Sequence, residues 1–574
     1  MTDLLDHRDA ATNPERASER VAADTVVQAA GDRFRTHQVA NQVPPLDGYD
    51  PLACDPAVAD ALRGEGAEYA LPRIREVAQV VGSAEGREHA RLANEHKPEL
   101  RTHDRYGNRI DEVEFHPSWH WLMDVSVRAG NTAAPWAPDA EPAAHVARAA
   151  SFYLMSQLEQ GHCCPITMTY AAVPVLRHDP EIAARYEAGL RSRVYDPGLV
   201  EPSGKAGLLA GMSMTEKQGG SDVRSGTTVA TPSSDGTYTL VGHKWFTSAP
   251  MNDMFLTLAQ APGGLTCFLL PRVLPDGTRN PIRLQRLKDK LGNRSNASAE
   301  IEYQDAVGWR LGEEGRGVRT IIDMVSVTRL DCVLGSASLM RIALSEAAHH
   351  VAHRSAFGAR LADQPLMRSV VAELAAETEA STRLALRLAG AFDRGSEQEA
   401  ALLRLALPVT KYLVCKRTSA VVAEASECLG GNGYVEESMM PRLYREAPLN
   451  SIWEGSGNVN ALDSLRAMAR SPESAEALLA EVDLAAGESA AFDAGVRALR
   501  AELATPDERR ARRLAELAAT CLQGSVLIRQ APAEVAEVFL ASRFGEDSGW
   551  RTAGTHTASD TATAAVLARI TPTV

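Results

Sequence analysis

Apolar residues recur at three- and four-residue spacing through most of the first third of the chain. Residues 143–159, with the sequence AAHVARAASFYLMSQLE, show this period clearly. Such spacing is typical of a helix with one buried face. Similar patterns extend over residues 55–205, so the sequence predicts a helical domain over residues 36–210. Residues 1–35 are polar and rich in alanine, without an apolar stripe, and we assign them to a polar extension.

The pattern changes after Gly211, where short β-branched and aromatic runs alternate with turn residues. Asp235-Gly236 and Pro275-Asp276-Gly277 are turn signals between these runs. The sequence therefore predicts a compact β domain over residues 211–312. Its clearest strand candidates are residues 238–241, 255–259, 266–270 and 299–303.

Helical spacing returns from about residue 315 and continues toward the C-terminus. No proline occurs between Pro281 and Pro365, which permits helices of bundle length. The order of helices, strands and helices predicts an α+β fold that is mainly α. We expect a helical bundle over residues 313–467 and a C-terminal helical extension over residues 468–574, ending in a mobile Thr/Ala-rich tail.

Composition is that of a folded, soluble protein, with 45% apolar and 23% charged residues among 574. The formal net charge of −14 disfavours a general affinity for nucleic-acid phosphates. No signal-peptide pattern and no run of 18 apolar residues is present. We therefore expect a cytoplasmic protein with no membrane association. The eight cysteines form no C-x-x-C pair, and we interpret them as reduced thiols.

The most informative local segment is residues 211–222, GMSMTEKQGGSD, at the entrance to the β domain. Adjacent glycines let backbone N–H groups approach a ligand, and the hydroxyls of Thr215 and Ser221 can donate to it. The segment is a candidate cofactor cradle, although an ordinary turn before a strand would have a similar composition. Two histidine pairs have the i,i+4 spacing of metal ligands, His116 with His120 and His349 with His353. No carboxylate or thiol cluster accompanies either pair, so we predict no metal site.

Several motifs occur in the order found in one family. MTEKQGGSD at 214–222 resembles the first signature of the acyl-CoA dehydrogenase flavoproteins, and GHKWFT at 242–247 resembles their flavin-stacking strand. RSAFG at 354–358 resembles a flavin contact made across subunits, and LGGNGY at 429–434 with NSIWEGSGN at 450–458 resembles the C-terminal signature. CPITMT at 164–169 and RLKDKLGNRSNAS at 286–298 are similar to the AidB (adaptive response to alkylation) branch, and the resemblance covers residues 36–467.

The resemblance implies an N-terminal helical domain, a middle β-barrel-like domain, a C-terminal four-helix bundle, a homotetramer and bound FAD. It also implies α,β-dehydrogenation of an acyl thioester, in which Glu454 removes the α-proton while hydride passes to the flavin. A glutamate that only caps a helix is the alternative interpretation of Glu454. Arg329 matches an arginine near the substrate mouth, although an ion pair on a helix surface would explain it too. Cofactor contacts carried over from the family are Met212, Met214, Thr215, Ser221, Trp245, Phe246, Thr247, Arg354, Phe357, Gly431, Asn450, Ser456 and Asn458.

The chain departs from the family pattern on the adenine side of the cofactor. Cys428 stands where a glutamine usually precedes Leu-Gly-Gly, and Pro365 replaces another glutamine, with Gln364 one place early. We therefore expect different adenine contacts from those of the family. Nothing in the sequence identifies the acyl substrate.

Two other functions remain open from the sequence. In the AidB branch the C-terminal region is associated with DNA, so weak binding of double-stranded DNA in protection against alkylation is the second candidate. Residues 471–574 contain ten arginines, no lysine and fifteen acidic residues, a net charge of −5, which is the wrong sign for a phosphate-binding surface. We name the arginines at 509, 510, 512 and 513 the arginine cluster. A flavin oxidase or monooxygenase on the same fold is the third candidate.

Overall fold

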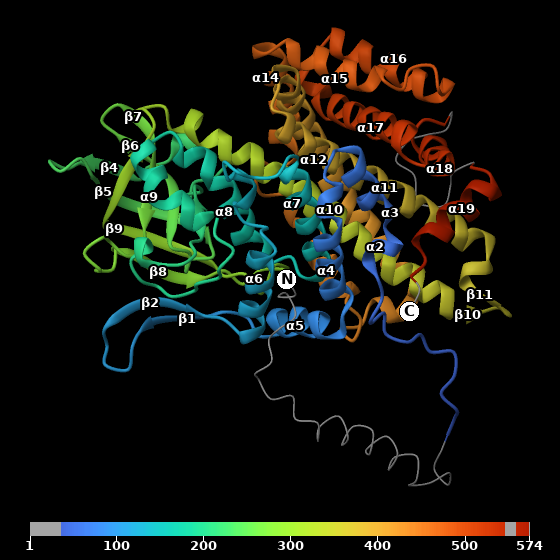
Figure 1. The fold of residues 1–574 in the computed structure, drawn as a ribbon, viewed down its shortest axis with the longest axis horizontal. Coiled ribbons are helices and arrows are strands. Elements are labelled where there is room, and N and C mark those ends of the chain that lie inside the picture. Colours follow the sequence, from blue (N-terminus) through green and yellow to red (C-terminus); the bar gives the residue numbers. More distant parts are fainter. Residues whose placement is uncertain (1–35, 546–557, 573–574) are drawn as a thin grey trace.

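The computed structural model describes residues 36–545 and 558–572. Figure 1 shows a β domain beside a large helical body, with the C-terminal helices stacked on that body. Short helices build the N-terminal domain, and their apolar faces share one core with the C-terminal helices. These helices are α2 (Pro51–Cys54), α3 (Pro56–Gly64), α4 (Leu71–Gly82), α5 (Ala84–Glu95), α6 (Pro117–Arg128), α7 (Ala144–Leu158), α8 (Cys163–Leu176) and α9 (Pro180–Leu190).

A hairpin of two strands interrupts this helical domain, so the prediction of helices throughout residues 55–205 is wrong at this point. Strands β1 (Glu99–His103) and β2 (Arg109–Glu114) pair antiparallel. Asp104 turns the chain between them, because its Oδ1 accepts the backbone N–H groups of Tyr106 and Asn108. Residues 99–114 alternate in burial, as a strand pair covering one side of a core does.

The middle domain is a barrel, which confirms the prediction of a β-barrel-like domain. All four predicted runs lie within strands, in β5, β6, β7 and β9. The strand order is β3-β6-β4-β5-β9-β7, with β8 beside β9, and β7 pairs with β6 to close the ring. The strands are β3 (Ala210–Ser213), β4 (Val229–Pro232), β5 (Tyr238–Ser248), β6 (Met254–Ala261), β7 (Gly264–Pro271), β8 (Ile282–Leu287) and β9 (Ser298–Leu311).

Long helices follow the barrel, as the proline-free stretch predicted. The helix α10 (Gly317–His353) runs 37 residues, and α11 (Pro365–Arg394) begins at the proline that ends that stretch. Proline is favoured in the first turn of a helix because its missing N–H has no partner there anyway. A small hairpin, β10 (Ser355–Ala356) and β11 (Ala359–Arg360), joins these two helices. The bundle continues with α12 (Glu397–Cys428), α13 (Met440–Glu446) and α14 (Gly457–Arg470).

The C-terminal extension packs on the bundle and is part of the same hydrophobic core. Buried ion pairs fasten it there: Arg387 of α11 pairs with Glu481 at 2.7 Å, and Arg543 pairs with Glu377 at 2.7 Å. Its helices are α15 (Glu473–Asp483), α16 (Ala490–Ala504), α17 (Ala511–Gln530), α18 (Ala533–Arg543) and α19 (Asp560–Ile570). The predicted mobile tail lies partly outside the described residues, as does the polar extension at 1–35. Within the described ranges, no helix is both long and apolar enough to span a bilayer.

Candidate active site

Glu454 lies in a tight loop between a short 3₁₀ turn at Leu449–Ser451 and helix α14. Its backbone has a φ of 55°, in the left-handed region that side chains other than glycine rarely adopt. Its side chain reaches α10, where the Thr328 hydroxyl donates to Glu454 Oε2 at 2.7 Å. The hydrogen bond from Thr328 therefore fixes the orientation of the carboxylate. A glutamate that only capped helix α14 would not need this contact.

Lys411 of α12 fixes the backbone of this loop. Its ammonium donates to three carbonyl oxygens, those of Asn450 at 2.9 Å, Trp453 at 2.8 Å and Gly455 at 2.8 Å. Lys411 is only 1% exposed. An ammonium can donate three hydrogen bonds, and all three here go to carbonyl oxygens of one loop. A single buried charge therefore fixes the backbone on both sides of Glu454.

Arg329 supports the same loop from α10. Its Nε donates to the backbone oxygen of Glu454 at 3.4 Å, and its Nη1 donates to Asp463 of α14 at 2.7 Å. Arg404 shares the Asp463 carboxylate at 3.0 Å. Arg329 is buried, so its ion pair is an internal brace and not the exposed helix pair considered from the sequence. Its guanidinium is occupied by these protein partners.

Removal from water raises the pKa of the Glu454 carboxyl above its ordinary value, since burial disfavours the charged form. The hydrogen bond from Thr328 and the charges of Lys411 and Arg329 act in the opposite direction. A carboxyl with a raised pKa is a stronger base once ionised, which suits it to remove a weakly acidic proton near neutral pH.

The second part of the site is the MTEKQGGSD loop, organised by a buried ion pair. Lys244 of β5 donates to Glu216 at 2.8 Å and to the Leu258 carbonyl at 2.8 Å. The Glu216 carboxylate also accepts the backbone N–H groups of Thr227 and Thr228 at 2.6 and 3.2 Å. Although burial opposes ionisation, Lys244 and these donors hold the pKa of Glu216 far below its ordinary value. Glu216 therefore shapes the loop as an ion.

This loop presents two free hydroxyls. Trp245 N–H donates to the Thr215 carbonyl at 2.7 Å, which ties the loop to β5. Gly220 lies directly against the Thr215 side chain, and a Cβ there would overlap it. Within the described chain, neither the Thr215 nor the Ser221 hydroxyl has a protein hydrogen-bond partner. Both remain available to a ligand, as the cradle hypothesis requires.

The GHKWFT strand places an aromatic pair beside this loop. Lys288 lies over the Trp245 ring at 3.4 Å from its centroid and 4.7 Å from that of Phe246. Phe246 is half exposed. Thr247 is buried, and its hydroxyl lies 2.5 Å from that of Ser213. The Phe246 ring is therefore accessible, whereas the Lys288 ammonium covers one face of Trp245 and Thr247 is buried against the barrel.

The two parts converge although more than 200 residues separate them. Met212, Met214 and Trp453 all pack on the same apolar cluster of the barrel and α8. Trp453 in turn donates its indole N–H to Asn450 Oδ1 at 2.8 Å, and Asn450 donates to Ser336 at 3.2 Å. The Glu454 loop and the start of the MTEKQGGSD loop therefore pack on one shared apolar cluster, and their union in a common site stays a prediction.

Three of the predicted cofactor residues lie far from Glu454 in the folded chain. Arg354 directly follows α10 and comes 25 residues after Arg329. At a rise of 1.5 Å per helical residue, Arg354 lies about 37 Å from Arg329 along the helix axis. The adjoining hairpin β10–β11 lies on the opposite side of the molecule from the barrel in Figure 1. Phe357 at its tip is 99% exposed with a φ of 53°. Gly431, just beyond α12, is likewise about 30 Å from Lys411. None of these three can join Glu454 within one chain.

Three known domain families match successive parts of the chain. Residues 41–197 match the adaptive response protein AidB N-terminal domain, residues 211–306 the acyl-CoA dehydrogenase middle domain and residues 315–501 the acyl-CoA dehydrogenase C-terminal domain. The chain is 49% identical to the putative acyl-CoA dehydrogenase AidB of Escherichia coli over 479 residues, covering 83% of this chain and 88% of that one. The chain belongs to the acyl-CoA dehydrogenase family. Its similarity is to the AidB branch, as the sequence motifs indicated.

Solved structures of this family share the fold. Caenorhabditis elegans ACDH-11 in complex with C11-CoA aligns with a TM-score of 0.82 at 28% identity, covering 91% of this chain and 96% of that one. A Bacillus anthracis acyl-CoA dehydrogenase complexed with FAD aligns with a TM-score of 0.63 at 18% identity, covering 79% and 91%. The second likeness concerns the fold alone.

The residues that hold the two loops in place were not predicted from the sequence. Lys411 and Lys244 position the two loops, and Thr328 aims Glu454. A signal for both lysines was present, because each stands in an apolar stretch, ALPVTKYLVC and GHKWFT. A lone charge in such a run is costly to bury and needs partners. No local signal marks Thr328, whose role depends on a loop 126 residues away.

Proposed function

We propose that this protein is an FAD-dependent dehydrogenase of acyl thioesters, with Glu454 as the base that removes the α-proton. The observation that carries the proposal is the Glu454 carboxylate itself, aimed by Thr328 and held on a loop that Lys411 braces through three carbonyls. A base must be fixed within reach of the proton it removes, and its pKa must suit the working pH. The fixed position of the Glu454 carboxylate and its raised pKa support this role.

The residues present fit a flavin nucleotide. Thr215 and Ser221 offer free hydroxyls, and the strand beside them offers the exposed Phe246 ring. FAD bound there would supply the hydride acceptor that balances removal of the proton. Membership of the acyl-CoA dehydrogenase family supports this cofactor.

Several features of the chain would favour the carbanion-like species that forms when the proton leaves. The Glu454 backbone N–H has no partner within the described chain, so it can donate to the thioester oxygen as negative charge develops there. The acyl chain would exclude water from the carboxylate, which strengthens that interaction. ACDH-11, the relative in complex with C11-CoA, supports a CoA thioester as substrate.

We infer that the chain forms a homotetramer, and the position of Arg354 and Phe357 supports contact between copies. Both lie far from Glu454 along α10, and Phe357 presents a whole aromatic ring to solvent. An exposed ring on a short hairpin is typical of a contact with another molecule. We infer that these two residues complete the cofactor site of a neighbouring copy, with Arg354 binding phosphate through its planar guanidinium.

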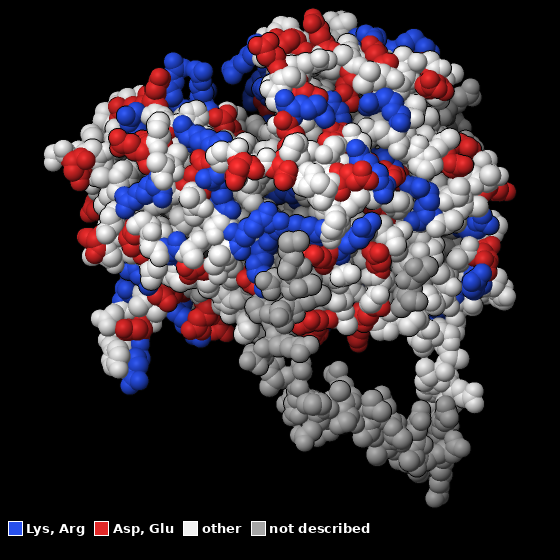
Figure 2. All heavy atoms as spheres, in the orientation of Figure 1, with Lys and Arg blue, Asp and Glu red and all other residues white. Residues whose placement is uncertain are grey.

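DNA binding has less support from the charges of the extension. Acidic and basic side chains are interspersed over the C-terminal helices at the top of Figure 2. DNA binding stays a prediction, as does the cytoplasmic location. An oxidase or monooxygenase on the same fold also stays a prediction, tested by how fast air reoxidises the reduced flavin.

The test is anaerobic reduction of the FAD-loaded protein by a series of acyl-CoA thioesters of increasing chain length. The expected result is loss of the flavin absorbance near 450 nm with at least one thioester, at a rate that depends on chain length. The proposal is refuted if dithionite bleaches the bound flavin while no thioester does.

A further inference from the structure

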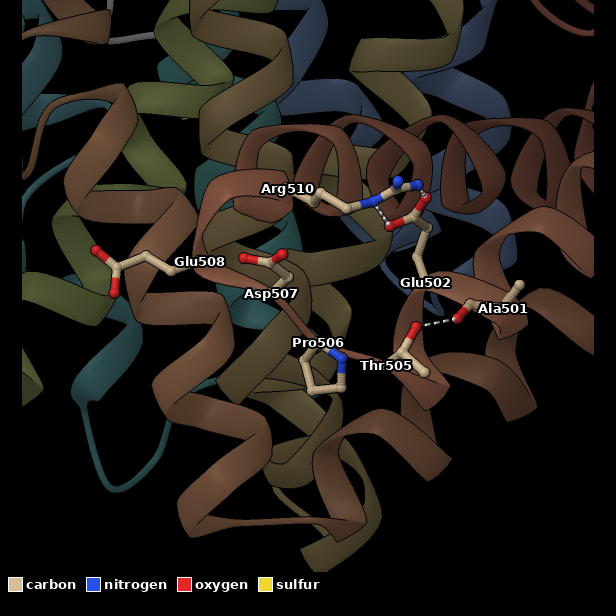
Figure 3. Close-up of a pocket in the computed structure, with 7 residues that line it drawn as sticks. All are labelled: Ala501, Glu502, Thr505, Pro506, Asp507, Glu508 and Arg510. Atoms are coloured by element: carbon tan, nitrogen blue, oxygen red, sulfur yellow. Dashed lines mark hydrogen bonds and ion pairs between the residues drawn. The ribbon is translucent and has the colours of Figure 1, made fainter.

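The four arginines of the arginine cluster do not act as one basic surface. Arg510 forks onto Glu502, as Figure 3 shows, and Arg513 donates to the same carboxylate at 2.9 Å. Arg509 pairs with Asp507 at 2.9 Å. These three arginines are therefore paired with two carboxylates of the extension itself, Glu502 and Asp507.

Arg512 is the exception, because its partner belongs to the candidate active site. Its Nε donates to Asn458 Oδ1 at 2.7 Å, from the first turn of α17 to the first turn of α14. Asn458 lies four residues after Glu454, in the NSIWEGSGN motif. A helix of the C-terminal extension therefore touches the segment that carries the catalytic base.

This contact fixes which way the Asn458 amide faces. An asparagine has an oxygen that accepts and an NH₂ that donates, and the partner of one end determines the position of the other. Because Arg512 can only donate, it selects the oxygen and turns the NH₂ away from the extension. Within the described chain the NH₂ group of Asn458 has no protein partner, so it is free to donate to an acceptor outside the protein.

We propose that Arg512 is a positioning residue of the flavin site, acting through Asn458, so that the C-terminal extension is a working part of that site. The inference rests on the proposed function, in which Asn458 contacts the flavin nucleotide. The Asn458 NH₂ then donates to an oxygen or ring nitrogen of the nucleotide, and loss of Arg512 lets the amide rotate and present its oxygen instead.

The test compares Arg512→Met with Arg509→Met, a control from the same cluster whose arginine is exposed and paired only with Asp507. Measured quantities are the FAD dissociation constant by fluorescence quenching, the visible spectrum of the bound flavin and the melting temperature of the apoprotein. We expect Arg512→Met to weaken FAD binding about tenfold, the effect of losing one well-oriented hydrogen bond, with an altered flavin spectrum. The apoprotein melting temperature and all Arg509→Met values should match wild type.

Two further variants test whether the effect runs through Asn458. Arg512→Lys keeps a donor and should restore most of the affinity. Asn458→Ala should cost as much as Arg512→Met, and the double variant should cost no more than either, since coupled residues are not additive. Additive losses, or equal FAD affinity in Arg512→Met and Arg509→Met, overturn the inference. A lowered apoprotein melting temperature with unchanged FAD affinity also overturns it, by indicating a packing role. Wild-type protein that binds no FAD refutes the proposed function itself, and this inference with it.

Discussion

Replacing Lys411 by methionine tests whether one buried charge builds the catalytic loop. Methionine keeps the length of the side chain and removes the ammonium, so the carbonyls of Asn450, Trp453 and Gly455 lose their shared donor. An unsatisfied buried polar group costs about 1–3 kcal/mol. Three such carbonyls would cost about 3–9 kcal/mol in total. Removing the ammonium also removes the cost of burying it, so we expect a net loss near the lower end, about 3 kcal/mol.

Urea unfolding followed by circular dichroism measures this loss, with Lys416→Met as the control. Lys416 lies on the same helix, is half-buried and makes no hydrogen bond or ion pair within the described residues. We expect a clear fall of the urea midpoint for Lys411→Met, together with a lower FAD content on purification, because the loop that carries Glu454 loses its shape. Lys416→Met should stay close to wild type. Equal midpoints and equal FAD content in the two variants would refute the bracing role of Lys411.

Three other outcomes follow from the same geometry. Thr328→Val removes the hydrogen bond that lowers the pKa of Glu454, so this pKa should rise further above its ordinary value. The acidic side of the pH profile of kcat/KM should then move to higher pH. An acidic side that stays in place or moves to lower pH contradicts this. Lys244→Met leaves the Glu216 carboxylate buried without its cation, and unfolding experiments should show a loss of about 3–5 kcal/mol, partly recovered when Glu216→Gln is added. Phe357→Ala should leave the melting temperature of the isolated subunit unchanged, since the ring is 99% exposed, while weakening assembly in analytical ultracentrifugation; unchanged assembly contradicts the intersubunit role.

Patterns with a local physical cause were predictable from the sequence. Helical spacing and the missing prolines anticipated α10 and α11, and the β-rich runs anticipated four barrel strands. The strands β3, β4 and β8 have four to six residues, too few for their alternation to be recognised. The hairpin β1–β2 was missed because polar residues dominate it, and its register depends on packing against the barrel.

The candidate site likewise has one part that the sequence predicted and one part that it did not. Motif order located Glu454 and the MTEKQGGSD loop, because both are contiguous in sequence. Their supports are not contiguous: Thr328 and Lys411 reach the loop from separate helices. The arginine cluster shows the limit most clearly: its four charges share three partners, and only the fold brings Glu502 and Asn458 near them, whereas Asp507 is two residues from Arg509.

Substituting Glu454 by glutamine tests whether this carboxylate is the base. Glu454→Gln keeps the shape of the side chain and its hydrogen bond with Thr328, but it cannot take a proton. The measurement is the rate of anaerobic flavin bleaching by the thioester that reduces wild type best, with FAD binding measured in parallel. The account predicts FAD binding close to wild type and bleaching slower by about 10²–10⁴-fold. Bleaching at the wild-type rate in an FAD-loaded Glu454→Gln protein would contradict it.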